Sequence, residues 1–241
     1  MEKESDPARR SIRSFVRRAG RLTPSQKKAL AELWPQFGID FDSRLLDLDA
    51  LFARRAPRTL EIGFGNGDTL VQQAAARPLH DFLGIEVHEP GVGHFLLRIR
   101  AAGITNLRLI RHDAMEVLAQ QIRGSSIDRI NLYFPDPWPK KRHHKRRIVS
   151  ASFLDLCAHA LCAGGSLHIA TDWDNYAEYI DESLAAHPDF VLADARTHAG
   201  DQPLDRPRTK FEQRGLLRGH QIHDWIFICE KQVEPLALSG T

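Results

Sequence analysis

Long apolar runs, a hydrophobic leader and a regular cysteine spacing are all missing from this sequence of 241 residues. No apolar stretch approaches the ~20 residues that a membrane-spanning helix needs. The first ten residues, MEKESDPARR, have no apolar centre, so we expect no signal peptide. Cys157, Cys162 and Cys229 form an odd set without metal-ligand spacing, which favours reduced, buried thiols in a cytoplasmic protein. These absences argue against membrane proteins and disulfide-rich secreted domains.

A metal site is not indicated either. His143 and His144 are adjacent inside a basic run, and the other ten histidines show no ligand spacing. We therefore expect no metal ion.

The length suits one α/β domain with an appendage, and the chain is long enough to bury a sizeable core. An apolar fraction of 42% and a charged fraction of 27% are typical of a soluble globular protein. We expect a basic, flexible N-terminal segment over residues 1–22, one domain over residues 23–235 and a C-terminal tail over residues 236–241. The residues leave open whether the protein is a monomer or a homodimer.

Acidic residues are absent from two segments that are rich in Lys and Arg. The segment from Arg9 to Lys28 holds eight Lys and Arg, and the segment from Lys140 to Arg147 holds six. Without these 14 residues, 19 Lys and Arg remain against 31 Asp and Glu, so the body of the protein is acidic although the net charge is +2. Two concentrated basic runs on an acidic body favour an anionic polymer as partner.

From Thr59 onward, short apolar runs alternate with helical patterns. Seven strands are expected, at TLEIGFGNG, DFLGIEV, LRLIRHDA, IDRINLYFPDP, GGSLHIATD, DFVLADART and HDWIFICEK. Helices are expected over residues 24–34, 43–52, 90–102, 115–122, 148–161 and 173–186, the first of them stopped by Pro35. The polar stretch between the last two strands is expected to be a loop. Alternating strands and helices predict an α/β protein whose mostly parallel sheet is covered on both faces.

Five of these strands end, or nearly end, in an acidic residue. The five are Glu61, Glu86, Asp113, Asp136 and Asp172. Ligands of open α/β sheets bind outside the carboxyl ends of the strands. Each acid alone fits a helix N-cap, but five at one edge would line a single cleft with negative charge. A ligand with a positive charge and sugar hydroxyls fits that cleft.

The first turn, GFGNGD, lacks the third glycine of the dinucleotide fingerprint, because Asp68 occupies that position. This substitution weakens the case for a nicotinamide cofactor. Gly63 and Gly65 still let the backbone approach a ligand closely. With Glu61 before the loop and Glu86 after the next strand, the pattern favours S-adenosylmethionine as the ligand. In that interpretation Asp113 and the backbone of Ala114 face the adenine.

The stretch FPDPWPKKRHHKRR follows the fourth of these strands. Its prolines stiffen the backbone around Asp136. Trp138 offers a surface on which a base can stack, worth ~1–3 kcal/mol per base. The basic residues from Lys140 to Arg147 are suited to phosphates, and each such contact adds to the salt dependence of binding. The coincidence of an aspartate, an aromatic residue and a basic run favours a nucleic-acid-modifying loop.

With these motifs, the chain resembles the bacterial tRNA (guanine-N7-)-methyltransferases. The matching segments run from residue 11 to about residue 225 and include RSFVRRAGRLTPSQKKAL, LEIGFGNG, FLGIEVHEPGV, INLYFPDPWPKKRHHKRR, HIATDWDNYAEY and RPRTKFEQRG. The resemblance implies a Rossmann-like class I methyltransferase fold and methyl transfer from S-adenosylmethionine to N7 of guanosine 46 in the variable loop of tRNA.

The resemblance also assigns roles to individual residues. Those implied to bind the methyl donor are Glu61, Gly63, Gly65, Glu86, Asp113, Ala114 and Asp136, and Asp136 is also implied to be catalytic. Those implied to contact the substrate are Lys140, Asp172, Thr209, Lys210, Phe211 and Glu212. Those implied to face the RNA are Arg142, His143, His144, Lys145, Arg146 and Arg147.

Three other interpretations stay open from the residues. A methyltransferase acting on an exocyclic amine of adenine or guanine in RNA would share the fold, although the PDPW and TKFE segments argue against it. A non-catalytic tRNA-binding module would gain nothing from an acidic cleft. A nicotinamide-dependent oxidoreductase is disfavoured by Asp68 and by the basic runs.

Overall fold

The computed structural model describes residues 13–15, 20–200 and 203–231. Most of the expected N-terminal segment, residues 1–22, and all of the expected tail, residues 236–241, lie outside these ranges. Within them, no helix has the length and apolar character to cross a membrane. The same residues contain no cluster of three or more His, Cys, Asp or Glu placed to hold a metal ion.

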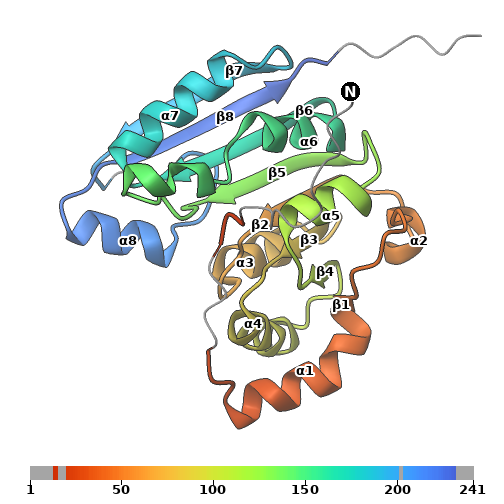
Figure 1. Ribbon diagram of the computed structural model, residues 1–241. Coiled ribbons are helices and arrows are strands. Elements are labelled where there is room, and N and C mark those ends of the chain that lie inside the picture. The colour runs from red at the N-terminus through yellow and green to blue at the C-terminus, as the bar shows by residue number, and fades with distance from the viewer. Residues whose placement is uncertain (1–12, 16–19, 201–202, 232–241) are drawn as a thin grey trace, which may run out of the picture.

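A single mixed sheet runs through the described part of the chain (Figure 1). Its strands, in order across the sheet, are β1 (Gly38–Ile39), β4 (Leu107–Ile110), β3 (Asp81–Ile85), β2 (Arg58–Ile62), β5 (Ile127–Tyr133), β6 (Leu161–Thr171), β8 (Ile222–Cys229) and β7 (Phe190–His198). The strands from β1 to β6 in this order pair in parallel, whereas β8 is antiparallel to both β6 and β7.

The described chain therefore has eight strands where the sequence predicts seven. The additional strand is β1, in which Gly38 pairs with Leu109 and Ile39 with Ile110 at the edge of the sheet. Two residues are too few to show the alternation of apolar and polar side chains by which strands are recognised.

Helices cover both faces of the sheet. One apolar cluster joins the sheet to α2 (Leu48–Phe52), α5 (Ala114–Gln120), α6 (Ala151–Ala160) and α7 (Asp174–Ala185). A second cluster joins the opposite face to α1 (Pro24–Phe37), α3 (Asp68–Ala76) and α4 (Glu89–Ala102). The two remaining helical segments, the 3-10 helix η1 (Lys141–Arg146) and α8 (Lys210–Leu217), belong to neither cluster.

The first helix begins as expected and ends later than expected. Thr23 and Gln26 form a capping box, in which each side chain bonds the backbone N–H of the other residue. Pro35 does not stop the helix, which continues to Phe37. Because Pro35 lies in the last turn, its missing N–H removes one backbone hydrogen bond without unwinding the turns before it.

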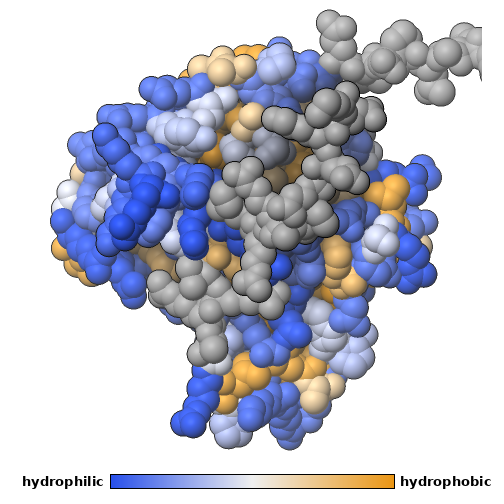
Figure 2. All heavy atoms as spheres, in the orientation of Figure 1, coloured by the Kyte–Doolittle hydropathy of each residue, from blue (hydrophilic) through white to orange (hydrophobic). Residues whose placement is uncertain are grey.

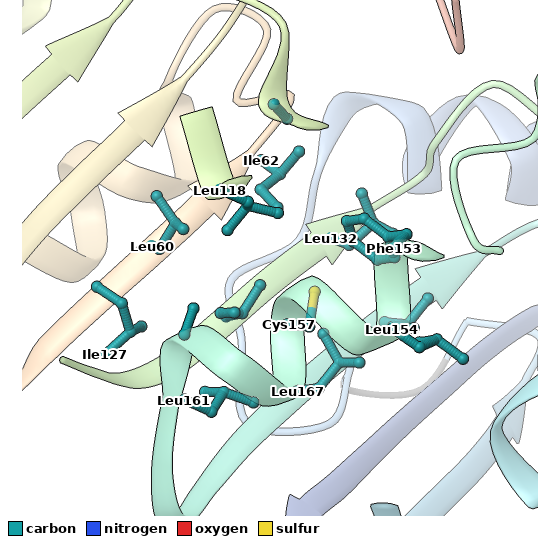
Figure 3. Packing of buried hydrophobic residues seen from close by; sticks show 14 of the residues in the cluster. Leu60, Ile62, Leu118, Ile127, Leu132, Phe153, Leu154, Cys157, Leu161 and Leu167 are labelled. Atoms are coloured by element: carbon teal, nitrogen blue, oxygen red, sulfur yellow. The ribbon is translucent and has the colours of Figure 1, made fainter. Parts of the chain in front are cut away.

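The larger core lies between the sheet and the helices α5, α6 and α7 (Figure 3). Leu60, Ile130 and Leu167, from three neighbouring strands, are fully buried there against Phe153 of α6. Cys157 and Cys229 are buried thiols in the same cluster, as expected, whereas Cys162 is partly exposed. This packing fixes the strands that carry the acidic residues at their ends.

Replacing Phe153 with Ala should lower the free energy of unfolding by about 3–5 kcal/mol, because a fully buried ring leaves a cavity. Urea unfolding followed by circular dichroism measures this change. The matched variant Phe153→Leu keeps most of the volume and should cost distinctly less. Equal costs for the two variants would contradict the tight packing around this ring.

Candidate active site

The order of the strands brings the five acidic residues to one edge of the sheet. The strands β4, β3, β2, β5 and β6 are neighbours and run in parallel, so their carboxyl ends lie side by side. Glu61 lies inside β2, and the other four acids follow β3, β4, β5 and β6. The chain reverses its direction of travel across the sheet between β2 and β5, which is where open α/β sheets bind ligands.

Glu61 is buried at this edge, and only one of its two carboxylate oxygens accepts a hydrogen bond. Its Oε1 accepts a hydrogen bond of 2.9 Å from the hydroxyl of Thr69, and within the described residues Oε2 has no partner. Burial raises the pKa of Glu61 from 4.5 to about 7, against the opposing effects of Thr69 and the Arg206 guanidinium. A buried carboxylate with a vacant acceptor suits a cationic or N–H-bearing ligand.

The glycine-rich loop borders open space next to Glu61. Gly63 and Gly65 have positive φ angles of 74° and 58°, and a Cβ added to either would meet no atom within 4 Å. The loop is held from the other side by Glu86, whose Oε2 accepts from the backbone N–H of Gly65 at 2.9 Å. The loop, the vacant oxygen of Glu61 and the half-buried carboxylate of Glu86 therefore fit a ligand such as S-adenosylmethionine.

Asp113 has a structural role as well as a place at this edge. It is the N-cap of α5, and its Oδ1 accepts from the backbone N–H of Met115 at 3.0 Å. Ala114, the first residue of that helix, is buried. The cap fixes the direction of the Asp113 carboxylate, which remains partly exposed.

The loop after β5 has an unusual backbone on both sides of Asp136. Phe134 and Trp138 have positive φ angles of 52° and 47°, which are uncommon for residues other than glycine. Phe134 is tied to the neighbouring strand, because its N–H donates to the carbonyl of Ala170 at 2.7 Å. Asp136 lies between them and is exposed to solvent. Strain of this kind is typical of functional loops.

Trp138 is more enclosed than the sequence suggests. The Arg146 guanidinium lies over its ring at 5.0 Å from the centroid, and its Nε1 donates to the carbonyl of Ser14 at 3.1 Å. A base that stacks on Trp138 must therefore use the other face of the ring or displace Arg146.

The basic run forms η1, and its members divide into two environments. Lys140, Lys141, Arg142 and Lys145 are exposed. Arg147 is only 5% exposed; it donates to Pro137 and Asn175 and lies 4.7 Å from the centroid of the Tyr176 ring. In this conformation Arg147 braces the loop that holds Asp136, and its guanidinium is not available to a phosphate.

The segment from Thr209 to Glu212 is the start of helix α8, where the sequence predicts only a loop. Thr209 and Glu212 form a capping box, so both side chains are occupied by backbone N–H groups and both are buried. Lys210 and Phe211 are exposed. The capping-box spacing, a Thr followed three residues later by a Glu, is the signal in the sequence that could have revealed this helix start.

Arg206 is fully buried between two carboxylates. Its Nε and one terminal nitrogen donate to the two oxygens of Asp224 at 2.8 and 2.6 Å, and the other terminal nitrogen donates to Glu212 at 2.6 Å. Burial by itself would raise the pKa of Asp224, but hydrogen bonds from His168 and Arg206 outweigh it and hold that pKa below its usual range.

The same guanidinium contacts the aromatic residues that lead into the loop holding Asp136. Its carbon atom lies 5.3 Å from the ring centroids of both Tyr133 and Phe134. Arg206 thus joins helix α8, through Glu212, to strand β8, through Asp224, and to the end of β5.

This polar cluster shares one face of the sheet with Glu61. Glu61, Asn131 and His168 are direct neighbours across β2, β5 and β6, and all three are buried. Burial lowers the pKa of His168, despite the opposing hydrogen bond to Asp224, and so favours the neutral form of the ring. These positions alternate with the apolar residues of the core, and a polar residue at every second strand position is the signal by which the sequence could have revealed them.

Helix α8 and the residue His220 after it contact two carboxylates near the strand ends, Asp68 and Asp172. Lys210 pairs with Asp68, at the start of α3, with a distance of 2.9 Å. A Cβ added to Gly215 would come within 2.7 Å of the carboxylate of Asp172, so only glycine permits this approach. His220, just beyond the helix, bonds the same Asp172 oxygen at 3.1 Å. The structure thus brings Asp172 and Lys210 to the edge that carries the other acids.

Replacing Glu61 with Gln should change how stability depends on pH in the ligand-free protein. The folded-state pKa is raised, so protonation of Glu61 stabilises the wild-type fold at low pH, and this contribution disappears as the pH rises through about 7. Gln does not titrate, so the variant should gain up to about 3 kcal/mol relative to the wild type between about pH 4.5 and 8. Urea unfolding at a series of pH values measures this gain, and a difference that is constant with pH would contradict the raised pKa.

Replacing Arg206 with Met should lower the free energy of unfolding by about 3–5 kcal/mol, because Glu212 and Asp224 remain buried without their cation. The matched variant Arg214→Met removes an exposed arginine of helix α8 and should stay within about 0.5 kcal/mol of the wild type. Similar losses in the two variants would show that the buried cluster does not hold the helix.

Comparison with known proteins agrees with this geometry. Residues 55–225 match a family model described as "Putative methyltransferase". The chain is 53% identical to the tRNA (guanine-N(7)-)-methyltransferase of Halorhodospira halophila, over 90% of this chain and 95% of that protein. It is 54% identical to the enzyme of the same name from Nitrosococcus oceani, over 90% of this chain and 91% of that protein.

Solved structures share the fold at low sequence identity. The 16S rRNA methyltransferase KamB superposes with a TM-score of 0.56 and 16% identity, over 77% of this chain and 95% of that one. A 16S rRNA (adenine(1408)-N(1))-methyltransferase from Catenulisporales acidiphilia, solved with its cosubstrate, has a TM-score of 0.55 and 17% identity, over 82% of this chain and 96% of that one. From the family model and the two relatives that it matches over nine tenths of its length, the chain belongs to the tRNA (guanine-N(7)-)-methyltransferase family.

Proposed function

We propose that this protein transfers a methyl group from S-adenosylmethionine to N7 of a guanosine in tRNA, at position 46 of the variable loop. The observation that carries the proposal is the set of five acidic residues at adjacent strand ends, flanked by the cationic helix η1, in a chain about half identical to tRNA (guanine-N(7)-)-methyltransferases. A tRNA substrate implies that the enzyme works in the cytoplasm.

The donor-binding residues we propose are those around the glycine-rich loop: Glu61, Gly63, Gly65, Glu86, Asp113 and Ala114. When bound, S-adenosylmethionine supplies a methyl group on a positively charged sulfur. The vacant oxygen of Glu61 accepts a hydrogen bond from S-adenosylmethionine, and the open space beside Gly63 and Gly65 lets this ligand come close to the backbone. Glu86, beside the loop, accepts hydrogen bonds from ribose hydroxyls.

Asp136 is the residue to which we assign catalysis. N7 of guanine carries a lone pair and no proton, so the attacking atom needs no general base. The enzyme must instead align this nitrogen with the methyl carbon, and such positioning contributes up to ~7–11 kcal/mol in ideal cases. The purine gains positive charge during the transfer, and a fixed carboxylate at Asp136 stabilises that charge. Arg147 keeps the loop rigid by bonding the carbonyl of Pro137.

We assign the contacts with the RNA and the guanine from the solvent exposure of the side chains. Lys140, Arg142, His143, His144, Lys145 and Arg146 are proposed to face the RNA, with Arg147 supporting them from inside. Asp172 is proposed to accept hydrogen bonds from the guanine edge, because it lies partly exposed at the strand ends. Thr209 and Glu212 shape the turn that presents Lys210 and Phe211 to the substrate.

Incubation with labelled S-adenosylmethionine and unmodified tRNA tests the proposed reaction. Borohydride and aniline then cleave the RNA at 7-methylguanosine, and a single cut in the variable loop is the expected result. Label incorporation without this cut would mean a methyltransferase with a different target atom. Binding of tRNA without incorporation would favour the non-catalytic module.

Replacing Asp136 with Ala should lower the turnover number by about 10²–10³-fold, the loss typical of removing one positioned electrostatic group. The affinity for tRNA should change little, because phosphate contacts dominate it. Single-turnover methylation at saturating tRNA and filter binding measure the two effects separately. Turnover close to that of the wild type would remove Asp136 from the catalytic role.

A further inference from the structure

Helix α8 presents two faces of different character. Its inner face holds the site together, through Glu212 against Arg206 and Gly215 against Asp172. Its outer face is exposed and cationic. Between residues 206 and 221 the only acidic residue is Glu212, and its side chain is fully buried. No carboxylate of this segment therefore reaches the surface to neutralise the outer face.

Helical spacing gathers the cations of this face. Lys210, Arg214 and Arg218 follow one another at intervals of four residues, which places them along one side of the helix. All three are exposed. Phe211 is 56% exposed and Leu217 is 89% exposed, so apolar side chains project beside the cations. We call the exposed side formed by Lys210, Phe211, Arg214, Leu217 and Arg218 the outer face of α8.

Arginines elsewhere on the surface are arranged differently. Ion pairs tie most of them to a nearby carboxylate: Arg44 to Asp42, Arg55 to Asp49, Arg98 to Asp68, Arg100 to Glu32 and Arg111 to Glu89. In the part of the chain that the structure describes, neither Arg214 nor Arg218 forms an ion pair, and the same holds for Arg142 and Arg146 of η1. Cations kept apart from carboxylates are available to an anionic partner.

The outer face lies close to the proposed active site, because α8 contacts Asp172 through Gly215 and Asp68 through Lys210. Figure 1 shows α8 near the end to which the arrow of β5 points, and most residues on this side of the molecule are hydrophilic, with a few apolar ones among them (Figure 2). Asp172 contacts α8 through Gly215, and three residues later Asn175 bonds Arg147 at the end of η1. Both cationic segments therefore meet the same strand end, that of β6.

We propose that the outer face of α8 is a second tRNA-binding surface, in which Arg214 and Arg218 contact phosphates and Phe211 contacts a base or ribose. The inference rests on the proposed function, because it takes tRNA as the substrate. The strand ends next to η1 and α8 carry carboxylates that repel the RNA backbone. Two cationic surfaces, one on η1 and one on α8, hold the polyanion at this acidic edge more firmly than either surface alone.

A pair of double variants tests this surface. Arg214→Ala with Arg218→Ala removes the two proposed contacts. Arg44→Ala with Arg55→Ala removes the same charge near α2, on the opposite side of the molecule in Figure 1. Binding of unmodified tRNA is measured for both and for the wild type between about 50 and 200 mM salt, with the logarithm of the association constant plotted against the logarithm of the salt concentration.

The slope of this plot should fall in magnitude by about 1.5 for the α8 pair, since each lost phosphate contact removes roughly 0.7–0.9, and it should not change for the control pair. The charge-retaining exchange of Arg214 and Arg218 to Lys should restore most of the slope.

Two results would overturn the inference, and they differ. If the wild type transfers no methyl group to tRNA, the proposed function fails and the inference fails with it. If the wild type methylates tRNA but the α8 pair and the control pair bind with the same slope, the inference alone fails. Unfolding midpoints equal to that of the wild type confirm that both double variants are folded.

Discussion

The ion pairs between Arg206 and the carboxylates of Glu212 and Asp224 hold together the edge of the sheet on which the proposed site depends. Asp224 belongs to β8 and Glu212 to α8, while the aromatic contacts of Arg206 are with the end of β5. One buried guanidinium therefore fixes a helix, an antiparallel strand and the start of the loop that holds Asp136 relative to one another. Such a cluster is costly to desolvate, but removing one partner costs more, so the geometry is well defined.

The proposed reaction places two opposite electrostatic requirements on this edge of the sheet. A methyl donor with a positive charge is best bound by carboxylates, whereas tRNA is a polyanion that carboxylates repel. The described chain separates the two requirements in space. The carboxylates stand at the ends of five adjacent strands, and exposed cations lie beside them on η1 and α8. Buried partners hold these segments in place: Arg147 under η1, and Glu212 under α8.

Much of this architecture was predictable from the sequence, because it rests on local patterns. Alternating strands and helices predict the parallel sheet, and the acids after the strands fall at one edge, as the strand order requires. The strand β1 was not predicted because its two residues are defined only by their pairing with β4. The continuation of α1 through Pro35 was not predicted because it depends on the position of that proline in the last turn. The burial of Arg147 and Arg206 could not be predicted, since a basic residue in a polar stretch shows nothing of the carbonyls or carboxylates that enclose it.

A structure of the enzyme bound to tRNA and S-adenosylhomocysteine tests the proposed site most directly. We expect a guanine of the variable loop beside Asp136, with its N7 about 3–3.5 Å from the place of the transferred methyl group. We also expect phosphates on η1 and on the outer face of α8. A guanine bound away from the ends of β2 and β5, or RNA that leaves the strand-end acids exposed to solvent, would contradict the proposed site.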